Sequence, residues 1–208
     1  MSGPVSATDL LDLLATRRVC RDFLADPVAE EDLVALLEAA RWATSAGNLR
    51  VHRFLVIQDP DRIRLTRALA PGVLGVPPAI VAICVDLDVA ERAGVRPDRD
   101  TSVIIDVGTA AMAMMAEAHA LGLGTCPATS FSQAGVQTVL GLPAPARPEM
   151  LLLVGHPAQV AARPRRRPPR HPSPKLLEIA YWERYGEPLP RPSVYGSTSS
   201  GGVWGPRL

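Results

Sequence analysis

The segment from Val103 to Leu121 constrains the fold of this chain more than any other, because it is rich in alanine and methionine and has few charges. A helix that is apolar nearly all round is buried in the protein core. Gly122 and Gly124 follow at once, and glycine is favoured just past a helix C-terminus. The segment predicts a long buried helix at the centre of the fold, with core packing favoured over pocket lining for its methionines.

Shorter hydrophobic patterns before and after this segment predict the other strands and helices. Three compact apolar runs have strand length and predict a buried sheet: Phe54–Ile57, Ala79–Val85 and Met150–Val154. Apolar residues at helical spacing predict helices over Ala29–Ala43, Asp61–Leu69 and Ser132–Leu140. Ser6 and Asp9 form a capping box for a first helix that ends near Arg17. Helices interleaved with buried strands predict an α+β domain with a central sheet.

The 208 residues are enough for one domain with a sizeable core. We assign residues 1–187 to a single domain that carries a C-terminal extension. This extension is rich in proline and arginine, then shows a short helical pattern from Pro174 to Arg184 that needs another surface to pack on. Residues 188–208 are rich in Pro, Gly and Ser and predict a flexible tail, in which the role of Trp204 stays open.

Charge and cysteine content exclude several classes of protein. The formal net charge is +1 and Lys175 is the single lysine, so nucleic acid is not an expected partner. The arginine-rich run 163–170 leaves a polyanion as a competing ligand there. Three cysteines without C-x-x-C spacing indicate reduced thiols in a cytoplasmic protein. No N-terminal signal pattern and no uninterrupted membrane-length run is present, so we expect no membrane partner.

Arginines cluster where the first predicted helix ends, at Arg17, Arg18 and Arg21. The planar guanidinium is permanently charged and suits phosphate oxygens, so the cluster indicates an anionic ligand. Arginines at a helix C-terminus also interact favourably with the helix dipole, and solvated side chains are the alternative interpretation.

Together with three further segments, this cluster resembles the flavin-dependent nitroreductase family, whose members open with an Arg-Arg-Ser-x-Arg-x-Phe motif. The four segments, in order, are Thr16–Phe23, Ala43–Phe54, Leu121–Phe131 and Gly155–Pro168. The resemblance runs from about Ala7 to Glu178. It implies a central mixed sheet flanked by helices and an intertwined homodimer with two FMN sites at the subunit interface.

The resemblance also implies which residues would bind FMN. The phosphate, the ribityl chain or the pyrimidine edge would be contacted by Arg17, Arg18 and Arg21, and by Arg166 with Arg165 or Arg167 as substitutes. Ser45 and Asn48 match a loop contributed across the dimer. The backbone of Pro127, Ala128, Thr129 and Ser130 matches the segment that faces N5 of the ring.

Two positions depart from the family pattern. Val19 replaces the usual serine of the first motif, which leaves at best a backbone contact there. Arg50-Val51-His52 stands where many members have Gln-Pro-Trp, so the adjoining pocket has its own shape.

The resemblance implies an oxidoreductase that takes hydride from NADH or NADPH, a transient electron donor, onto FMN. The electrons then pass to a nitroaromatic, a quinone or a similar conjugated acceptor by a ping-pong mechanism. A flavin carries the redox chemistry itself, so we assign no catalytic acid or base, and the role of Cys126 stays open.

Two alternatives remain open. Residues 71–75, 84–86 and 124–127 resemble the catalytic subunit of cyclodipeptide oxidases, which implies a desaturase of a cyclic dipeptide or related amide that uses oxygen. A flavin-binding protein without turnover is the other alternative. The sequence motifs of other enzyme classes are absent. The chain has no dinucleotide-binding G-x-G-x-x-G after a strand, no phosphate-binding G-x-x-x-x-G-K-[ST], no hydrolase G-x-S-x-G and no metal-binding H-E-x-x-H.

Overall fold

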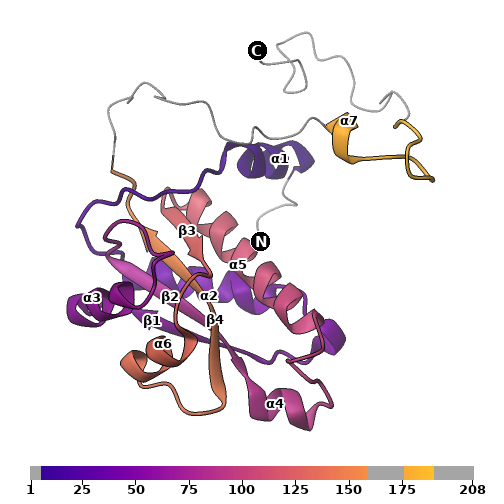
Figure 1. The fold of residues 1–208 in the computed structure, drawn as a ribbon. Coiled ribbons are helices and arrows are strands. Elements are labelled where there is room, and N and C mark those ends of the chain that lie inside the picture. The colour runs from indigo at the N-terminus through magenta and orange to yellow at the C-terminus, as the bar shows by residue number, and fades with distance from the viewer. Residues whose placement is uncertain (1–5, 159–175, 190–208) are drawn as a thin grey trace. The chain divides into compact units, whose positions relative to one another are not determined.

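The computed structural model describes residues 6–158 and 176–189, and the chain divides into two units, residues 1–160 and 161–208 (Figure 1). The elements of the first unit are α1 (Ala7–Thr16), α2 (Glu30–Trp42), a 3-10 turn η1 (Ala46–Asn48), β1 (His52–Ile57), α3 (Pro60–Ala68), β2 (Ala79–Asp86), α4 (Leu87–Arg92), α5 (Ser102–Ala120), β3 (Gly124–Ala128), α6 (Gln133–Leu140) and β4 (Ala146–Gly155). The second unit contains α7 (Leu176–Ile179). A single domain over 1–187 stays a prediction, and the 190–208 part of the tail lies outside the described residues.

The four strands form one sheet in the order β1-β2-β4-β3, and every neighbouring pair is antiparallel. The α+β class is therefore confirmed. The expected mixed character is not found in these strands: within the described residues, the parallel pairing is an isolated bridge between Val19 and Thr125.

Side chains of β2 alternate between two hydrophobic clusters, because successive residues of a strand point to opposite faces. Val81 and Ile83 pack with α2 and α5, whereas Ile80 and Ala82 pack with α3 and α6. Figure 1 shows the same arrangement, with α5 along one face of the sheet and α3 and α6 on the other. The core therefore has two layers, one on each side of the sheet.

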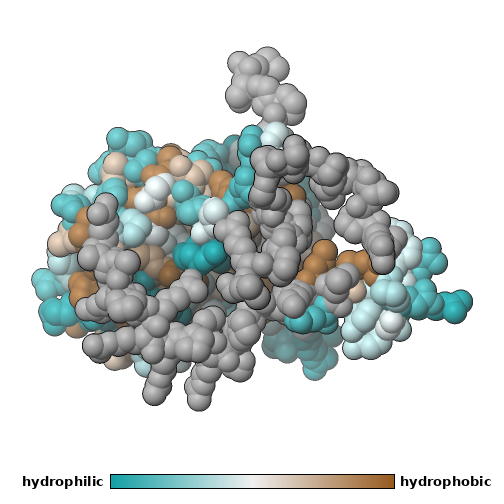
Figure 2. Space-filling model, turned by 90° about the horizontal axis from the view of Figure 1, so that it is seen from above, coloured by the Kyte–Doolittle hydropathy of each residue, from teal (hydrophilic) through white to brown (hydrophobic). Residues whose placement is uncertain are grey.

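The predicted central helix is α5, and its buried residues include Val107 and Met114. By length and composition alone α5 could cross a membrane, but its buried face packs in the first of these clusters, as the core helix of a soluble fold does. Outside that buried face α5 carries Ile104 and Ile105, which are 49% and 62% exposed in the single chain. Among the coloured residues of Figure 2, hydrophobic and hydrophilic ones are interspersed, so no single apolar patch dominates that view.

Most predicted elements are present with shifts of a residue or two, except that the predicted strand Met150–Val154 begins four residues earlier, at Ala146 of β4. Ser6 caps α1 by accepting from the backbone N–H of Asp9, 3.1 Å, and Ser132 caps α6 in the same way. The sequence does not predict β3, whose Gly124 and Pro127 disfavour strands. The C-terminal helical pattern is mostly not helical in the described residues, where α7 covers Leu176–Ile179.

Candidate functional site

Residues 17–24, which carry the arginine cluster and which we call the strap, run beside β3. Val19 forms a parallel bridge with Thr125, and the N–H of Cys20 donates to the carbonyl oxygen of Thr125, 2.8 Å. Gly124 makes this approach possible, because a Cβ added there would lie 2.6 Å from Cys20 Cβ. Two of the four resembling segments are therefore brought into contact, and a backbone contact from Val19 to FMN stays a prediction.

The same strap meets the end of β4. Phe23 bridges Pro157, and Leu24 N–H donates to the carbonyl oxygen of His156, 2.9 Å. The N–H of Ala158 donates to Asp22, also at 2.9 Å. The start of the fourth resembling segment thus lies against the first, while its arginines Arg165, Arg166 and Arg167 lie outside the described residues.

The loop of residues 71–78 also lies against the strap. Gly75 has φ +81°, and a Cβ there would lie 2.1 Å from the carbonyl oxygen of Arg21, so only glycine fits. The N–H of Gly72 donates to the carbonyl oxygen of Ser130, 2.9 Å. This loop therefore links Arg21 to the end of the segment that was predicted to face a flavin ring.

The clustered arginines are not equivalent. Arg18 Nη1 donates to the carbonyl oxygens of Ala15 and Arg17, so this guanidinium caps the end of its own helix. Arg17 Nη1 is buried and has no hydrogen-bond partner within the described residues. Leaving a buried donor unpaired costs about 1–3 kcal/mol, which an anionic ligand would recover. Arg17 therefore stays a candidate for binding a phosphate-bearing group.

The end of α1 is anchored to the core helix. Thr16 Oγ1 and His119 Nε2 lie 3.0 Å apart, within hydrogen-bonding distance. His119 belongs to the last turns of α5, so the residue before Arg17 is tied to the C-terminal part of that helix. No sequence pattern pointed to this contact, because His119 carries no motif.

The Ser45 loop is held near the opposite end of α5. Both carboxylate oxygens of Asp106 accept from the N–H of Ala46, at 3.1 and 2.9 Å, and Thr109 Oγ1 donates to the carbonyl oxygen of Thr44, 3.0 Å. Asp106 is 7% exposed, and a buried carboxylate needs such partners. Ser45 Oγ is itself buried without a hydrogen-bond partner in the described part of the chain.

The structure therefore does not bring all predicted site residues together in one chain. Asp106 and His119 mark two positions on α5 that are about 20 Å apart at about 1.5 Å per residue. Ser45 and Asn48 lie at the first position, and Arg17 lies at the second. Asn48 has φ +55° and accepts from Arg50 Nε, 3.0 Å.

The predicted ring-facing segment spans the end of β3 and the turn after it. Pro127 and Ala128 belong to β3, and Thr129 and Ser130 follow it and are exposed. Thr129 lines a pocket of about 420 Å³ together with Ile104, Val107, Phe131, Gln133, Glu149 and Met150. Sequence reasoning missed this pocket.

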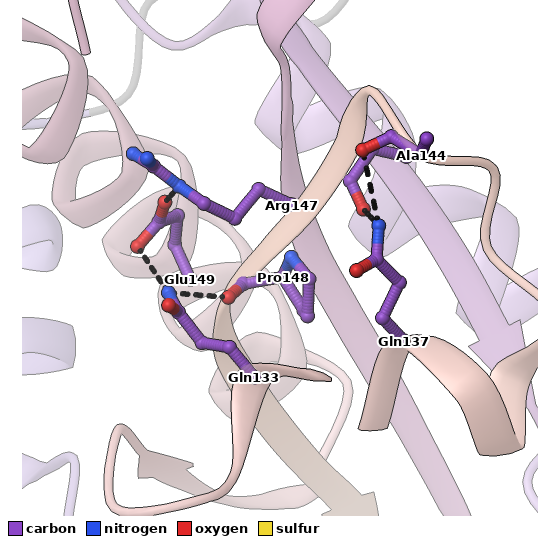
Figure 3. Close-up of polar contacts among 7 residues, drawn as sticks. Gln133, Gln137, Ala144, Arg147, Pro148 and Glu149 are labelled. Atoms are coloured by element: carbon purple, nitrogen blue, oxygen red, sulfur yellow. Dashed lines mark hydrogen bonds and ion pairs between the residues drawn. The ribbon is translucent and has the colours of Figure 1, made fainter. Parts of the chain in front are cut away.

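Glu149 is the charged residue of that pocket (Figure 3). It occupies a β-bulge in β4, since Ile83 pairs with Met150 and Cys84 with Pro148. Its carboxylate accepts from Arg147 Nε and from Gln133 Nε2, and Gln133 also donates to the carbonyl oxygen of Pro148. Bulges often re-aim a side chain beside a functional site. The sequence signal available for this site was Glu149 itself, a single acidic residue in a mostly apolar strand.

The thiols do not form a reactive centre. Burial and, to a smaller extent, the nearby charge of Glu149 raise the pKa of Cys84 to about 11. Burial also raises the pKa of Cys20, although a hydrogen bond to the backbone of Asp22 acts in the opposite direction. Cys126 is buried in the second hydrophobic cluster. Within the described residues, no group of three His, Cys, Asp or Glu side chains could hold a metal ion.

Comparison with known proteins agrees with this geometry. The sequence pattern of the Nitroreductase family matches residues 14–90 and 68–156. A Thermus thermophilus protein named NADH dehydrogenase is 30% identical over 188 residues, which covers 76% of this chain and 92% of the relative. A Bacillus subtilis protein named FMN reductase (NAD(P)H) is 27% identical over 175 residues, covering 77% of this chain and 70% of the relative.

Solved structures give the same answer for the fold. A nitroreductase family protein from Clostridium difficile superposes with a TM-score of 0.67 at 27% identity, covering 84% of this chain and 98% of the other. A protein described as a putative nitroreductase from Bacillus subtilis gives a TM-score of 0.71 at 20% identity, covering 85% and 100% of the two chains. The chain belongs to the nitroreductase family, and the resemblance drawn from its motifs is confirmed.

Proposed function

We propose that this protein is an FMN-dependent oxidoreductase that accepts electrons from NADH or NADPH. The observation that supports the proposal best is Arg17, whose buried Nη1 lacks a partner in the described part of the chain. It lies on the strap, which also contacts β3, where the segment expected to face the ring begins. A relative named FMN reductase (NAD(P)H) and a solved structure titled FMN-dependent nitroreductase support the choice of cofactor and donor.

In this proposal the chain's own residues bind and orient the cofactor. Arg17 and Arg21 hold the phosphate or the pyrimidine edge, and Arg18 adds positive charge while its Nη1 caps α1. The arginines at 165–167 are the remaining candidates for the phosphate. We expect the backbone after Pro127 to face the ring; the end of this segment is held by the carbonyl oxygen of Ser130, which accepts from the N–H of Gly72.

FMN would supply hydride chemistry, so the protein needs to provide binding, orientation and exclusion of competing reactions rather than an acid or base. The acceptor we propose is a nitroaromatic, a quinone or a similar conjugated molecule. Donor and acceptor would use the same open site in turn, which gives ping-pong kinetics. Thr129, at the edge of the 420 Å³ pocket, is placed to border that site.

We further propose a homodimer with the FMN sites at its interface. The exposed Ile104 and Ile105 on the core helix support a second subunit, because a monomer would leave this apolar face in water. Light scattering at micromolar concentration should give twice the 22.2 kDa chain mass. A monomer that retains FMN would contradict a site built from two subunits.

The decisive experiment is rapid-mixing absorbance of FMN-loaded protein. We expect anaerobic bleaching of the flavin band by NADH or NADPH, followed by reoxidation on adding a nitroaromatic or quinone. Unchanged spectra with both nucleotides, but bleaching by a cyclic dipeptide and recovery with oxygen, would replace the proposal by the desaturase. Protein that binds FMN but responds to neither would be a flavin-binding protein without turnover.

A further inference from the structure

The hydrogen bond between Thr16 and His119 has a defined direction. Thr16 Oγ1 donates to the carbonyl oxygen of Asp12, 2.6 Å, and lies 3.3 Å from that of Leu13. A hydroxyl has one proton and two acceptor lone pairs, so toward His119 this oxygen accepts. His119 therefore carries a proton on Nε2 and donates it to Thr16 Oγ1, 3.0 Å.

Packing alone holds α1 weakly in the single chain. Leu10, Leu11 and Leu14 are exposed, and Leu13 is half-buried. Most of the stability of a helix in a protein comes from packing of its apolar face, and α1 buries little of that face. The side-chain hydrogen bond from α5 therefore contributes a larger share of the attachment of α1 than it would for a well-packed helix.

Two contacts hold the chain on either side of Arg17. Before it, Thr16 accepts from His119. After it, the N–H of Cys20 donates to the carbonyl oxygen of Thr125, 2.8 Å. His119 and Thr125 lie on either side of the turn that joins α5 to β3, so residues 16–20 are held at both ends to the two flanks of this turn.

The guanidinium of Arg17 depends on this attachment more than that of its neighbour. Arg18 Nη1 donates to two carbonyl oxygens of its own chain segment, which fix its position locally. Arg17 is half-buried, and its Nη1 has no hydrogen-bond partner in the described part of the chain. The position of this nitrogen is therefore set by the backbone from which the side chain leaves α1.

We propose that His119 is a positioning residue for cofactor binding, whose hydrogen bond to Thr16 fixes the end of α1 and so orients Arg17 toward FMN. This inference rests on the proposed role of Arg17 in binding FMN. His119 acts through Thr16 and the backbone rather than by contact with the cofactor. A donor that is already in place costs less to order when the ligand binds, which increases the affinity.

Titration of full-length flavin-free protein into FMN, followed by quenching of flavin fluorescence, tests the inference. His119→Asn has an amide too short to reach Thr16, and the dissociation constant should rise about 3- to 10-fold with the loss of one neutral hydrogen bond. His119→Gln has an amide N–H near the position of Nε2 and should restore most of the affinity. Thr16→Val keeps the shape without the hydroxyl, so it should match His119→Asn, and the two together should weaken binding no more than either alone.

Thr138 provides a matched control. Its Oγ1 donates to the carbonyl oxygen four residues earlier in α6, that of Ala134, 2.9 Å, as Thr16 does in α1. Its side chain is also exposed. Thr138→Val should leave FMN affinity unchanged, which separates the contact with His119 from the general effect of removing a helix threonine.

The Arg17→Met background separates positioning from a general loss of structure. There, His119→Asn should change FMN affinity by less than about 2-fold, because the group that it orients is gone. Equal weakening in both backgrounds, or no weakening when Arg17 is present, would overturn the inference and leave the proposed function standing. Wild-type protein that binds no FMN would overturn both.

Discussion

Replacing Arg17 by methionine should raise the stability of the cofactor-free protein while it lowers the affinity for FMN. Methionine keeps an unbranched stem that packs in the same space, but it removes the guanidinium. Because Arg17 Nη1 is buried without a partner among residues 6–158 and 176–189, its removal relieves a desolvation cost of about 1–3 kcal/mol. The side chain is only half-buried, so we expect the lower end, an increase of about 1 kcal/mol in the free energy of unfolding.

The same substitution removes a charge-assisted contact to phosphate. Such a contact contributes about 1.5–3 kcal/mol, so the dissociation constant of FMN should rise about 10- to 150-fold. Urea unfolding of flavin-free protein measures the first effect, and quenching of FMN fluorescence on titration measures the second. The two effects have opposite signs, which a general loss of folding cannot produce.

Arg18→Met is the neighbouring comparison. Arg18 Nη1 caps the carbonyl ends of α1, so its loss should cost about 0.3–1 kcal/mol of stability and reduce FMN affinity less than the change at Arg17 does. If Arg17→Met destabilises the flavin-free protein by more than about 1 kcal/mol, the unpaired donor is satisfied in solution and the reasoning is wrong. Unchanged FMN affinity would remove Arg17 from the site.

Three further changes test the parts that support the site. Asp106→Ala should lower the free energy of unfolding by about 2 kcal/mol, since it deletes the acceptor of the loop amide, and Asp106→Asn should lose less; urea unfolding decides. Gly75→Ala should destabilise the protein by about 2 kcal/mol or more in thermal melts, because the new methyl group would lie 2.1 Å from a carbonyl oxygen. Gly94→Ala is the control: Gly94 has φ +74° but no atom within 4 Å of the added methyl group, so the change should cost only about 1 kcal/mol. Burial raises the pKa of Cys84 from 9.0 to about 11, so the folded state retains the proton that the unfolded state releases, and stability should fall by up to about 3 kcal/mol as pH rises from 9.0 to 11. Cys84→Val should show a smaller fall over the same range, with the remaining slope coming in part from Cys20, whose pKa is also raised.

The parts of the fold that the sequence predicts are those whose signal is local. The apolar run of α5, the apolar run of β2 and the Ser6 cap each depend on residues a few positions apart, and all appear in the structure. The strand β3 could not be predicted this way, because glycine and proline disfavour a strand and its partner β4 begins many residues later. Long-range pairing with β4 and with the strap overrides that local preference.

In the candidate site too, some features could be predicted from the sequence and others depend on the three-dimensional structure. The arginine cluster was visible as composition, but the structure separates Arg17, which is unpaired, from Arg18, which caps a helix. That difference depends on the path of the chain after α1, which the spacing of residues in the sequence does not predict. Asp106 did carry a readable signal, because a carboxylate in an otherwise apolar buried helix must be paired. Its partner, the amide of Ala46, was not identifiable from the sequence.

The length of α5 bears most directly on the proposed two-subunit site. The Ser45 loop is fixed to Asp106, and the strap is fixed to His119, so the two groups of cofactor candidates are kept about 20 Å apart in one chain. In a dimer with twofold symmetry, residue i of one subunit contacts residue j of the other, and j contacts i. Two antiparallel α5 helices that overlap along their whole length would set the Asp106 position of each chain against the His119 position of the other. The exposed face of α5 and the division of the site between its two ends then have one common explanation.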